Sequence, residues 1–339
     1  MIKTTMRFFL VLLILSGTYS CKKRDNSNLM PPITGKAGEV VLVMPDALYD
    51  GFVGDSIANI LTQEEIALPQ TGMEGAEPIF DLVQIPPEAF SNVFKSHRNI
   101  IIAKLNPELS KGVLKVERSY WASQQLLIRI EAPTKESFVE LIDNQEDFIV
   151  QTIREAEIDR QVYLNRKYEN SELHRSILAN HDIITYFPKG YEALVDTGNF
   201  VWVQHDPMDM IQGVLLWDYP YVSEDQLDYE KLIGDQDKML KPRVPGGPPG
   251  SYMAIEFEAP LHSKTFEHNG NFVREIKGLW EMENGFMGGP FVSWTMVDEQ
   301  RDRLVTAFGF VYAPKYEKRN HIRKVESLIR TIEFPDQEI

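Results

Sequence analysis

The residue with the most distinctive chemistry in this sequence is Cys21, the only cysteine among 339 residues. Its thiolate is a nucleophile that can take up a covalent group or pair with a second cysteine. It follows Lys3 and Arg7, an apolar run over residues 8–15, and a short stretch of small or polar residues. This order is that of a secretory signal. Because a membrane span needs about 20 apolar residues, the short run does not predict a permanent transmembrane helix.

A single cysteine in an exported chain has no internal disulfide partner. Together with the preceding signal, Cys21 resembles the modified cysteine of a bacterial lipoprotein, cleaved after residue 20. Ser20 matches the small residue that this motif has before the cysteine, whereas Thr18 stands where the motif usually has Leu. The resemblance implies palmitate-like acyl chains on Cys21, and more than one chain is needed for stable anchoring. The alternative is an ordinary secreted protein with an unpaired cysteine.

Residues 21–34 are polar and contain two prolines, so they predict a tether between the anchor and the folded body. Lys22, Lys23 and Arg24 follow the cysteine directly, and such cations are attracted to anionic head groups. Lipoproteins displayed on the cell surface in some bacterial groups tend to carry acidic residues directly after the cysteine, whereas this sequence carries basic ones. The resemblance therefore implies an anchor in the outer membrane, with the protein facing the periplasm.

The composition is that of an acidic globular protein. Lys and Arg number 35 against 50 Asp and Glu, a net charge of −15, so nucleic acid is not an expected partner. Hydrophobic residues make up 43% of the chain, enough for packed cores. An exported body of about 320 residues exceeds the size at which single cores stop growing. We therefore expect two domains, at residues 35–180 and 181–335.

Common catalytic motifs are absent from the sequence, including Gly-x-Ser-x-Gly, His-Glu-x-x-His, the Walker loop and Cys-x-x-Cys. His205 lies near Asp206 and Asp209, which would suit either a metal or a turn after a strand. Asp235 and Asp237 lack the glycine and distal Glu of a calcium loop and indicate a solvated helix face. We therefore predict no metal, no cofactor and no catalytic residue.

Two loops predict the rim of a ligand pocket. Residues 243–250 alternate between stiff proline and permissive glycine, and residues 287–290 contain a Gly-Gly-Pro run. The aromatic residues that we expect to line such a pocket are Tyr252, Trp280 and Trp294. The alternative is that both loops are plain connectors and the aromatic residues belong to the core.

Apolar segments predict the strands of the first domain at residues 39–44, 80–85, 99–105 and 125–130. Helices are expected near residues 55–61 and 87–94. A longer amphipathic helix starts after the cap residue Thr134 and keeps a period of 3.6 residues through Ala156. The polar stretch 160–180 is consistent with its extension.

The second domain is richer in predicted strands, at residues 182–187, 199–204, 211–217, 252–257, 272–280, 291–297 and 304–312. Asn-Gly pairs at residues 269–270 and 284–285 indicate tight hairpins, hence an antiparallel sheet. Both alternating faces of residues 200–203 are apolar, so helices at residues 223–240 and after Pro314 are expected to cover the sheet on both sides. The fold class is α+β, and this half resembles the α/β/α sandwich of photosystem extrinsic proteins, which implies no function.

The whole chain is also similar to a family of uncharacterised bacterial envelope lipoproteins, which carry a domain of unknown function. Besides the signal ending at Cys21, the similarity lies in three motifs: Phe-Pro-Lys-Gly-Tyr at 187–191, Gly-Gly-Pro-Pro-Gly-Ser-Tyr-Met at 246–253, and Phe-Val-Tyr-Ala-Pro-Lys-Tyr-Glu-Lys-Arg at 310–319. The similarity implies a cell-envelope membrane location and no catalytic residue.

Two classes of function follow from these observations. The first is a non-catalytic module that binds an envelope protein or a small ligand, or that assists assembly. The second is a hydrolase-like envelope enzyme that uses carboxylates such as Glu256 and Glu281. Such an enzyme requires two acids in one cleft with separated pKa values, which only a structure can show.

Overall fold

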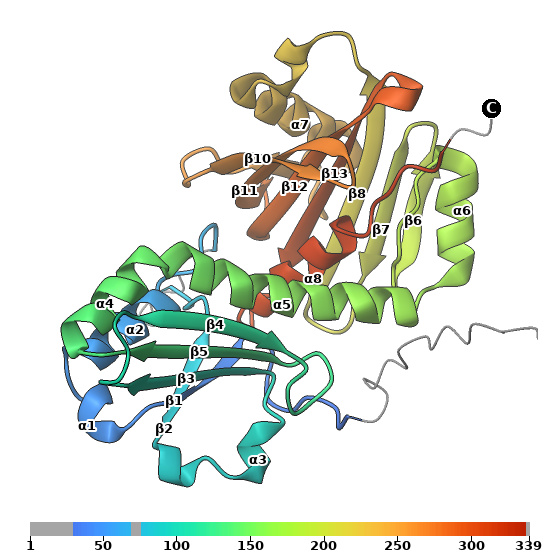
Figure 1. Ribbon diagram of the computed structural model, residues 1–339. Coiled ribbons are helices and arrows are strands. Elements are labelled where there is room, and N and C mark those ends of the chain that lie inside the picture. Colours follow the sequence, from blue (N-terminus) through green and yellow to red (C-terminus); the bar gives the residue numbers. More distant parts are fainter. Residues whose placement is uncertain (1–29, 69–75, 337–339) are drawn as a thin grey trace, which may run out of the picture.

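The computed structural model describes residues 30–68 and 76–336, which form two α+β domains, each built on one sheet (Figure 1). This confirms the expected fold class. The predicted signal peptide, Cys21 and most of the predicted tether lie outside the described residues. The end of the tether region contacts the first domain, since the Thr34 N–H donates to the Ser96 carbonyl at 2.8 Å. No helix within the described ranges is both long and apolar enough to cross a membrane.

The sheet of the first domain has the order β2-β1-β3-β5-β4. Its strands are β1 (Glu39–Val43), β2 (Asp81–Ile85), β3 (Asn99–Leu105), β4 (Val113–Arg118) and β5 (Leu126–Ala132). Only β4 runs antiparallel to its neighbour among these five strands of the described chain. The central strands are buried over most of their length, which explains their apolar sequences.

Helices α2 (Phe52–Leu61), α4 (Lys135–Asn144) and α5 (Glu146–Lys167) pack on one face of this sheet. Short helices α1 (Asp46–Tyr49) and α3 (Asn92–Lys95) and a 3-10 turn at Pro87–Ala89 complete the domain. The Thr134 hydroxyl accepts the Ser137 N–H and so caps α4 as expected. The expected single long helix is wrong, because the backbone leaves helical geometry at Gln145, where φ is −120°. A separate helix, α6 (Ser171–His181), follows α5.

The sheet of the second domain has the order β10-β11-β12-β13-β8-β7-β6, with β9 also paired to β11. Its strands are β6 (Glu192–Thr197), β7 (Phe200–His205), β8 (Ile211–Pro220), β9 (Tyr252–Ile255), β10 (His262–His268), β11 (Asn271–Glu283), β12 (Gly288–Asp298) and β13 (Arg303–Tyr312). All pairs in this sheet are antiparallel. Asn269 and Gly270, with φ of 50° and 80°, form the predicted hairpin turn between β10 and β11.

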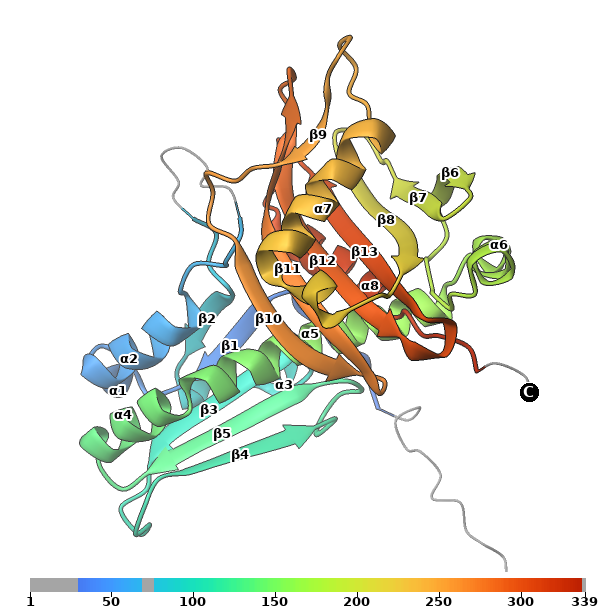
Figure 2. The same ribbon diagram turned by 90° about the horizontal axis from the view of Figure 1, so that it is seen from above.

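Helices cover both faces of this sheet, as the sequence predicts. A 3-10 turn at Glu224–Leu227 leads into α7 (Tyr229–Arg243), which lies on one face, while α8 (Arg319–Ile329) and α6 lie on the other (Figure 2). Side chains alternate between the two cores: Phe308 and Phe310 of β13 lie on the α7 side, and Val305 and Ala307 on the α8 side.

One predicted strand is wrong. Residues 182–187 pair with the C-terminal segment only at Ile184 and Glu333, which exchange two backbone hydrogen bonds of 2.9 Å. Ile183 and Phe187 are buried in the core, so this segment is apolar for packing reasons and not because it belongs to a ladder. Three strands were not expected, β4, β6 and β10, because their exposed residues lack an apolar run.

The first domain supplies the N-terminal cap of α8. The Glu77 carboxylate accepts the backbone N–H groups of Lys318 and Arg319 at 2.7 and 2.8 Å. The Arg319 guanidinium in turn lies 2.7 Å from the Asp81 carboxylate on β2. Because the first N–H groups of a helix have no partner within the helix, a residue of one domain completes an element of the other.

Buried charges also connect α5 and α8, which lie side by side (Figure 1). Arg154 of α5 bonds to both Glu65 and Glu326, and Arg323 of α8 bonds to Glu65. The Lys277 ammonium on β11 lies 2.9 Å from Glu326. We refer to Glu65, Arg154, Lys277, Arg323 and Glu326 as the interdomain ion cluster. It joins the two cores through opposite charges that are each largely removed from water.

Candidate ligand-binding site

Helix α7 is held on its sheet by a buried chain of hydrogen bonds. The Ser293 hydroxyl donates to the Gln236 side-chain oxygen at 2.9 Å, and the Gln236 amide donates to Thr295 Oγ1 at 3.4 Å. The Thr295 hydroxyl lies 2.9 Å from that of Thr306. A shift of α7 along the sheet would leave these buried groups unpaired, which is costly. The chain therefore fixes the register of the helix.

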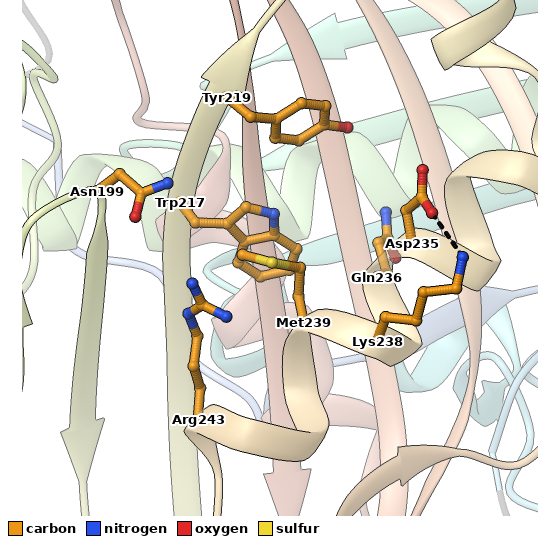
Figure 3. Close-up of a pocket in the computed structure, with 8 residues that line it drawn as sticks. All are labelled: Asn199, Trp217, Tyr219, Asp235, Gln236, Lys238, Met239 and Arg243. Atoms are coloured by element: carbon orange, nitrogen blue, oxygen red, sulfur yellow. Dashed lines mark hydrogen bonds and ion pairs between the residues drawn. The ribbon is translucent and has the colours of Figure 1, made fainter.

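A pocket of about 340 Å³ lies between α7, strand β8 and the turn that precedes β7 (Figure 3). We call it the Trp217 pocket. The sheet side contributes Asn199, Trp217 and Tyr219, and α7 contributes Asp235, Gln236, Lys238, Met239 and Arg243. Trp217 and Tyr219 are two residues apart on β8, so both side chains face the helix.

Trp217 forms the buried wall of this pocket. Its side chain is only 2% exposed as a whole, and its indole N–H makes no hydrogen bond within the described part of the chain but is open to the pocket. The other buried indoles are paired: Trp280 donates to the Val311 carbonyl at 3.2 Å, and Trp294 to Glu275 at 2.8 Å. The Trp217 N–H is thus the indole donor on this face that no protein acceptor within the described residues occupies. The Trp217 N–H is therefore available to a bound molecule.

Tyr219 adds a neutral polar group to the pocket. Burial raises the pKa of its hydroxyl to about 12, although a hydrogen bond with the Thr306 side chain partly opposes this rise. The phenol is thus protonated at neutral pH. It can serve as a hydrogen-bond donor or acceptor but not as a carboxylate-like base.

Of the three charged residues in the pocket lining, two form an ion pair with each other and the third does not. Lys238 lies 3.0 Å from Asp235 and is neutralised by it. The Arg243 guanidinium lies 5.4 Å from the Phe200 ring centroid and has no ion-pair partner among the residues that the structure describes. A second hollow of about 490 Å³, toward the β6–β7 turn, is also lined by Asn199 and Arg243. Arg243 thus stands where the two hollows meet.

The aromatic residues predicted to share a pocket lie apart. Trp280 lines a separate hollow of about 180 Å³ with Gly246, Gly247 and Met287, so the two predicted loops do meet beside it. Trp294 lies in the core on the α8 side of the sheet, whereas Trp280 lies on the α7 side. The alternation of side chains along β11 and β12 separates them. Tyr252 is engaged elsewhere, under the Lys241 ammonium at 4.5 Å from its ring centroid.

The acids considered for catalysis do converge. Burial raises the pKa of Glu281, and the nearby charges of Glu256 and Glu283 raise it further. Glu281 and Glu256 are both half-buried, and neither lines any of the three hollows described above. The hydrolase-like alternative stays a prediction.

The polar residues considered for metal binding have other partners. His205 Nδ1 lies 2.8 Å from the Gly190 carbonyl, and Asp209 pairs with Lys315 at 2.7 Å. Asp237 accepts the Ile255 N–H at 2.8 Å and thereby fixes β9 to α7. Within the described ranges no three His, Cys, Asp or Glu side chains gather as metal ligands would.

The sequence motifs do not point to Trp217, Tyr219 or Met239 as pocket residues. Two features of the sequence could have indicated the pocket. Trp217 and Tyr219 are two residues apart at the end of a predicted strand, and the following predicted helix carries Gln236 between two acids. The sequence alone could not assign that helix to this face, because an apolar sheet accepts helices on either side.

Comparisons with known proteins give domains without an assigned role. Residues 34–164 match the family model DUF8532 and residues 170–331 match DUF4837, each described as a domain of unknown function. These matches support the expected uncharacterised domain family, and the second begins at residue 170, ahead of the expected junction at 180. A search of curated proteins finds no match. A solved structure of a mutant of the protein Mog1 is 9% identical, with a TM-score of 0.29, and the match covers 45% of this chain and 90% of that one. At this score the similarity carries no argument.

Proposed function

We propose that this protein is a lipid-anchored component of a bacterial cell envelope, and that its second domain binds a small, mainly apolar ligand in the Trp217 pocket. The observation that carries the binding role is the Trp217 indole in the wall of this pocket, whose N–H opens into the pocket and makes no hydrogen bond with another described residue. Ligand pockets are typically apolar, about 300–1,000 Å³ in volume, with a few polar groups that orient the ligand. The Trp217 pocket fits this description in size and lining.

The anchor is proposed from the first residues of the sequence. A signal-like segment ends at Cys21, and three cations follow it. Two or more acyl chains on this residue hold a protein at a membrane, and the basic residues add attraction to anionic head groups. In this proposal the protein faces the periplasm from the outer membrane, and the pocket is presented to molecules or partner proteins of the envelope.

The binding role is tested with phenylnaphthylamine, an uncharged aromatic probe that fluoresces in apolar surroundings, added to the chain from residue 21 carrying Cys21→Ala. We expect saturable binding at one site per chain. Trp217→Ala should weaken it by about tenfold, because the main apolar wall and the N–H donor are lost. Met239→Ala, a milder change in the same pocket, should weaken it less.

Lys231→Ala serves as the control, since Lys231 is exposed on the same helix and lies outside the pocket. Circular dichroism verifies that each variant is folded. Unchanged affinity in both folded pocket variants, or the absence of saturable binding to the native pocket, would contradict the binding role.

The anchor is tested by metabolic labelling with palmitate, followed by separation of inner and outer membranes on a density gradient. We expect label in the native protein and its recovery with the outer membrane, and we expect Cys21→Ala to lose both. A native protein that is unlabelled and soluble would instead support the secreted alternative.

A further inference from the structure

We infer that the ligand of the Trp217 pocket is an anion: a flat, largely apolar molecule with one acidic group, which Arg243 binds at the junction of the two hollows. This inference rests on the proposed binding role and adds the chemical class of the ligand. It is drawn from the charges around the pocket, the position of Arg243 and the chemistry of the inner wall.

Arg243 is the unmatched charge of the site. Lys238 and Asp235 neutralise one another at 3.0 Å, so the lining as a whole carries one net positive charge. The chain itself has a net charge of −15. A positive pocket in an acidic protein concentrates anions locally against the field of the rest of the surface. An uncharged ligand would gain nothing from a positively charged pocket in an acidic protein.

The guanidinium is also suitably placed. It lies 5.4 Å from the centroid of the Phe200 ring, a cation–π contact that favours this position of the guanidinium. A planar guanidinium binds a carboxylate, sulfonate or phosphate through two parallel hydrogen bonds, and such bonds are about twice as strong as neutral ones. Because Arg243 lines both hollows, an acidic group bound to it remains near solvent while the rest of the molecule enters the inner pocket.

The inner wall of the pocket indicates the chemistry of the rest of the ligand, away from its acidic group. The indole of Trp217 and the phenol of Tyr219 offer flat surfaces to an aromatic or fused-ring system. The free Trp217 N–H and the neutral Tyr219 hydroxyl can each bond to a carbonyl or hydroxyl oxygen on that ring system. A ligand with an apolar ring system, an oxygen atom on that ring system and a terminal acidic group is an aromatic or polycyclic acid.

Arg243 could also serve the helix and not a ligand, and the experiment must separate the two roles. A cation in the last turn of a helix stabilises the helix through the macrodipole, whether or not a ligand binds. Lys241 stands in the same turn of α7 and carries the same charge, but its ammonium lies over Tyr252 and outside the Trp217 pocket. Lys241→Gln therefore changes the dipole interaction and the net charge as Arg243→Gln does, without changing the pocket.

The test uses two probes that share one ring system, anilinonaphthalene sulfonate and phenylnaphthylamine, of which only the first carries an acidic group. Titration calorimetry gives the affinity and stoichiometry of each. We expect the sulfonate to bind about tenfold more tightly than the neutral probe. Arg243→Gln should abolish this difference, so that the variant binds the two probes with equal affinity. Lys241→Gln should retain the difference.

Each result is decisive. If the neutral probe binds as tightly as the sulfonate and Arg243→Gln affects neither, the anionic ligand is refuted while the binding role stands. An equal loss of sulfonate binding in Arg243→Gln and Lys241→Gln would also refute it, because the effect would then be one of net charge. If neither probe binds at one site per chain, the proposed function itself fails.

Discussion

Glu326 is a buried carboxylate on which three cations converge. Its side chain is 1% exposed and accepts hydrogen bonds from Lys277 at 2.9 Å, Arg154 at 3.2 Å and Arg330 at 2.9 Å. Burial alone would raise the pKa of this carboxyl, but the three cations more than offset it and hold the pKa well below 4.5. Glu326 is therefore ionised at neutral pH and compensates charges from both domains.

Replacement of Glu326 by Gln should strongly destabilise the protein. The substitution keeps the side-chain shape but leaves buried cations without their counter-charge, a change that typically costs about 3–5 kcal/mol. We expect a loss of about 3 kcal/mol in the free energy of unfolding, measured by urea denaturation. Glu317→Gln, on an exposed residue just before α8, is the control and should change it by less than about 0.5 kcal/mol. Equal stability of the two variants would contradict this account.

The sequence predicts the helix that carries Glu326 but not the ion pairs that Glu326 forms. The apolar period of residues 322–332 places a helix here and Arg330 one turn from Glu326, but the other two partners lie 49 and 172 residues away along the chain. The same holds for the ligand pocket, where Trp280 and Trp217 are equally aromatic in the sequence. Both lie on the α7 side of the sheet, and only the folded structure shows that the Trp280 N–H reaches the Val311 carbonyl whereas Trp217 lines the pocket.

Helices α7 and α8 cover opposite faces of one sheet, and their glycine contacts differ. A Cβ added at Gly309 on β13 would lie 2.3 Å from Val325 Cγ1 and 3.0 Å from Ile329 Cδ1 of α8. A Cβ added at Gly234 within α7 would meet no atom within 4 Å. The close approach of α8 to the sheet thus depends on a glycine, whereas α7 carries one that packing does not require.

Alanine at these two positions should therefore have opposite effects. Gly309→Ala overpacks the contact with α8 and should lower the free energy of unfolding by about 1–3 kcal/mol. Gly234→Ala should raise it by about 0.5–1 kcal/mol, because alanine is the better helix former and no contact is disturbed. Thermal unfolding of the two variants measures both changes. A stabilised Gly309→Ala variant would show that α8 does not rest on β13 as closely as described.

The elements with an apolar pattern could be predicted, and those without one could not. Strands β3 and β13 lie where the sequence places them because burial on both faces requires apolar residues throughout. The edge strands β4, β6 and β10 carry exposed polar residues, so their pairing is decided by a neighbour and not by their own composition. The segment 182–187 shows the opposite error, since it is buried but not paired as a strand.

The molecule as a whole is held together by α5, which serves both domains. Ile149, Ile153 and Ala156 pack in the core of the first domain. Other side chains of the same helix reach the second domain: Arg154 bonds to Glu326, and Asn165 donates to the Ser327 hydroxyl at 2.9 Å. Because one helix contributes to two cores, we expect the domains to unfold as coupled units.

Glu65 provides a measure of that coupling. It lies in the first domain and is paired with Arg154 of α5 and Arg323 of α8. Burial opposes its ionisation, but the two guanidinium groups prevail and lower its pKa from 4.5 to about 2. Between these values the unfolded chain binds a proton at this residue that the folded chain does not. Stability from this ion pair is therefore fully present above pH 4.5 and is lost as the pH falls toward 2.

The acid sensitivity of the whole protein should consequently decrease in Glu65→Gln. The native chain is expected to lose stability on the order of 3 kcal/mol through this residue as the pH falls from 4.5 to 2. The variant should be less stable near neutral pH and should show a shallower decline in that range, measured by urea denaturation at a series of pH values. Glu64→Gln, at the exposed neighbouring residue, should keep the native pH dependence. If the native and Glu65→Gln curves stay parallel down to pH 2, Glu65 is not ionised between the domains, and the cores must be joined by other contacts such as the Glu77 cap of α8.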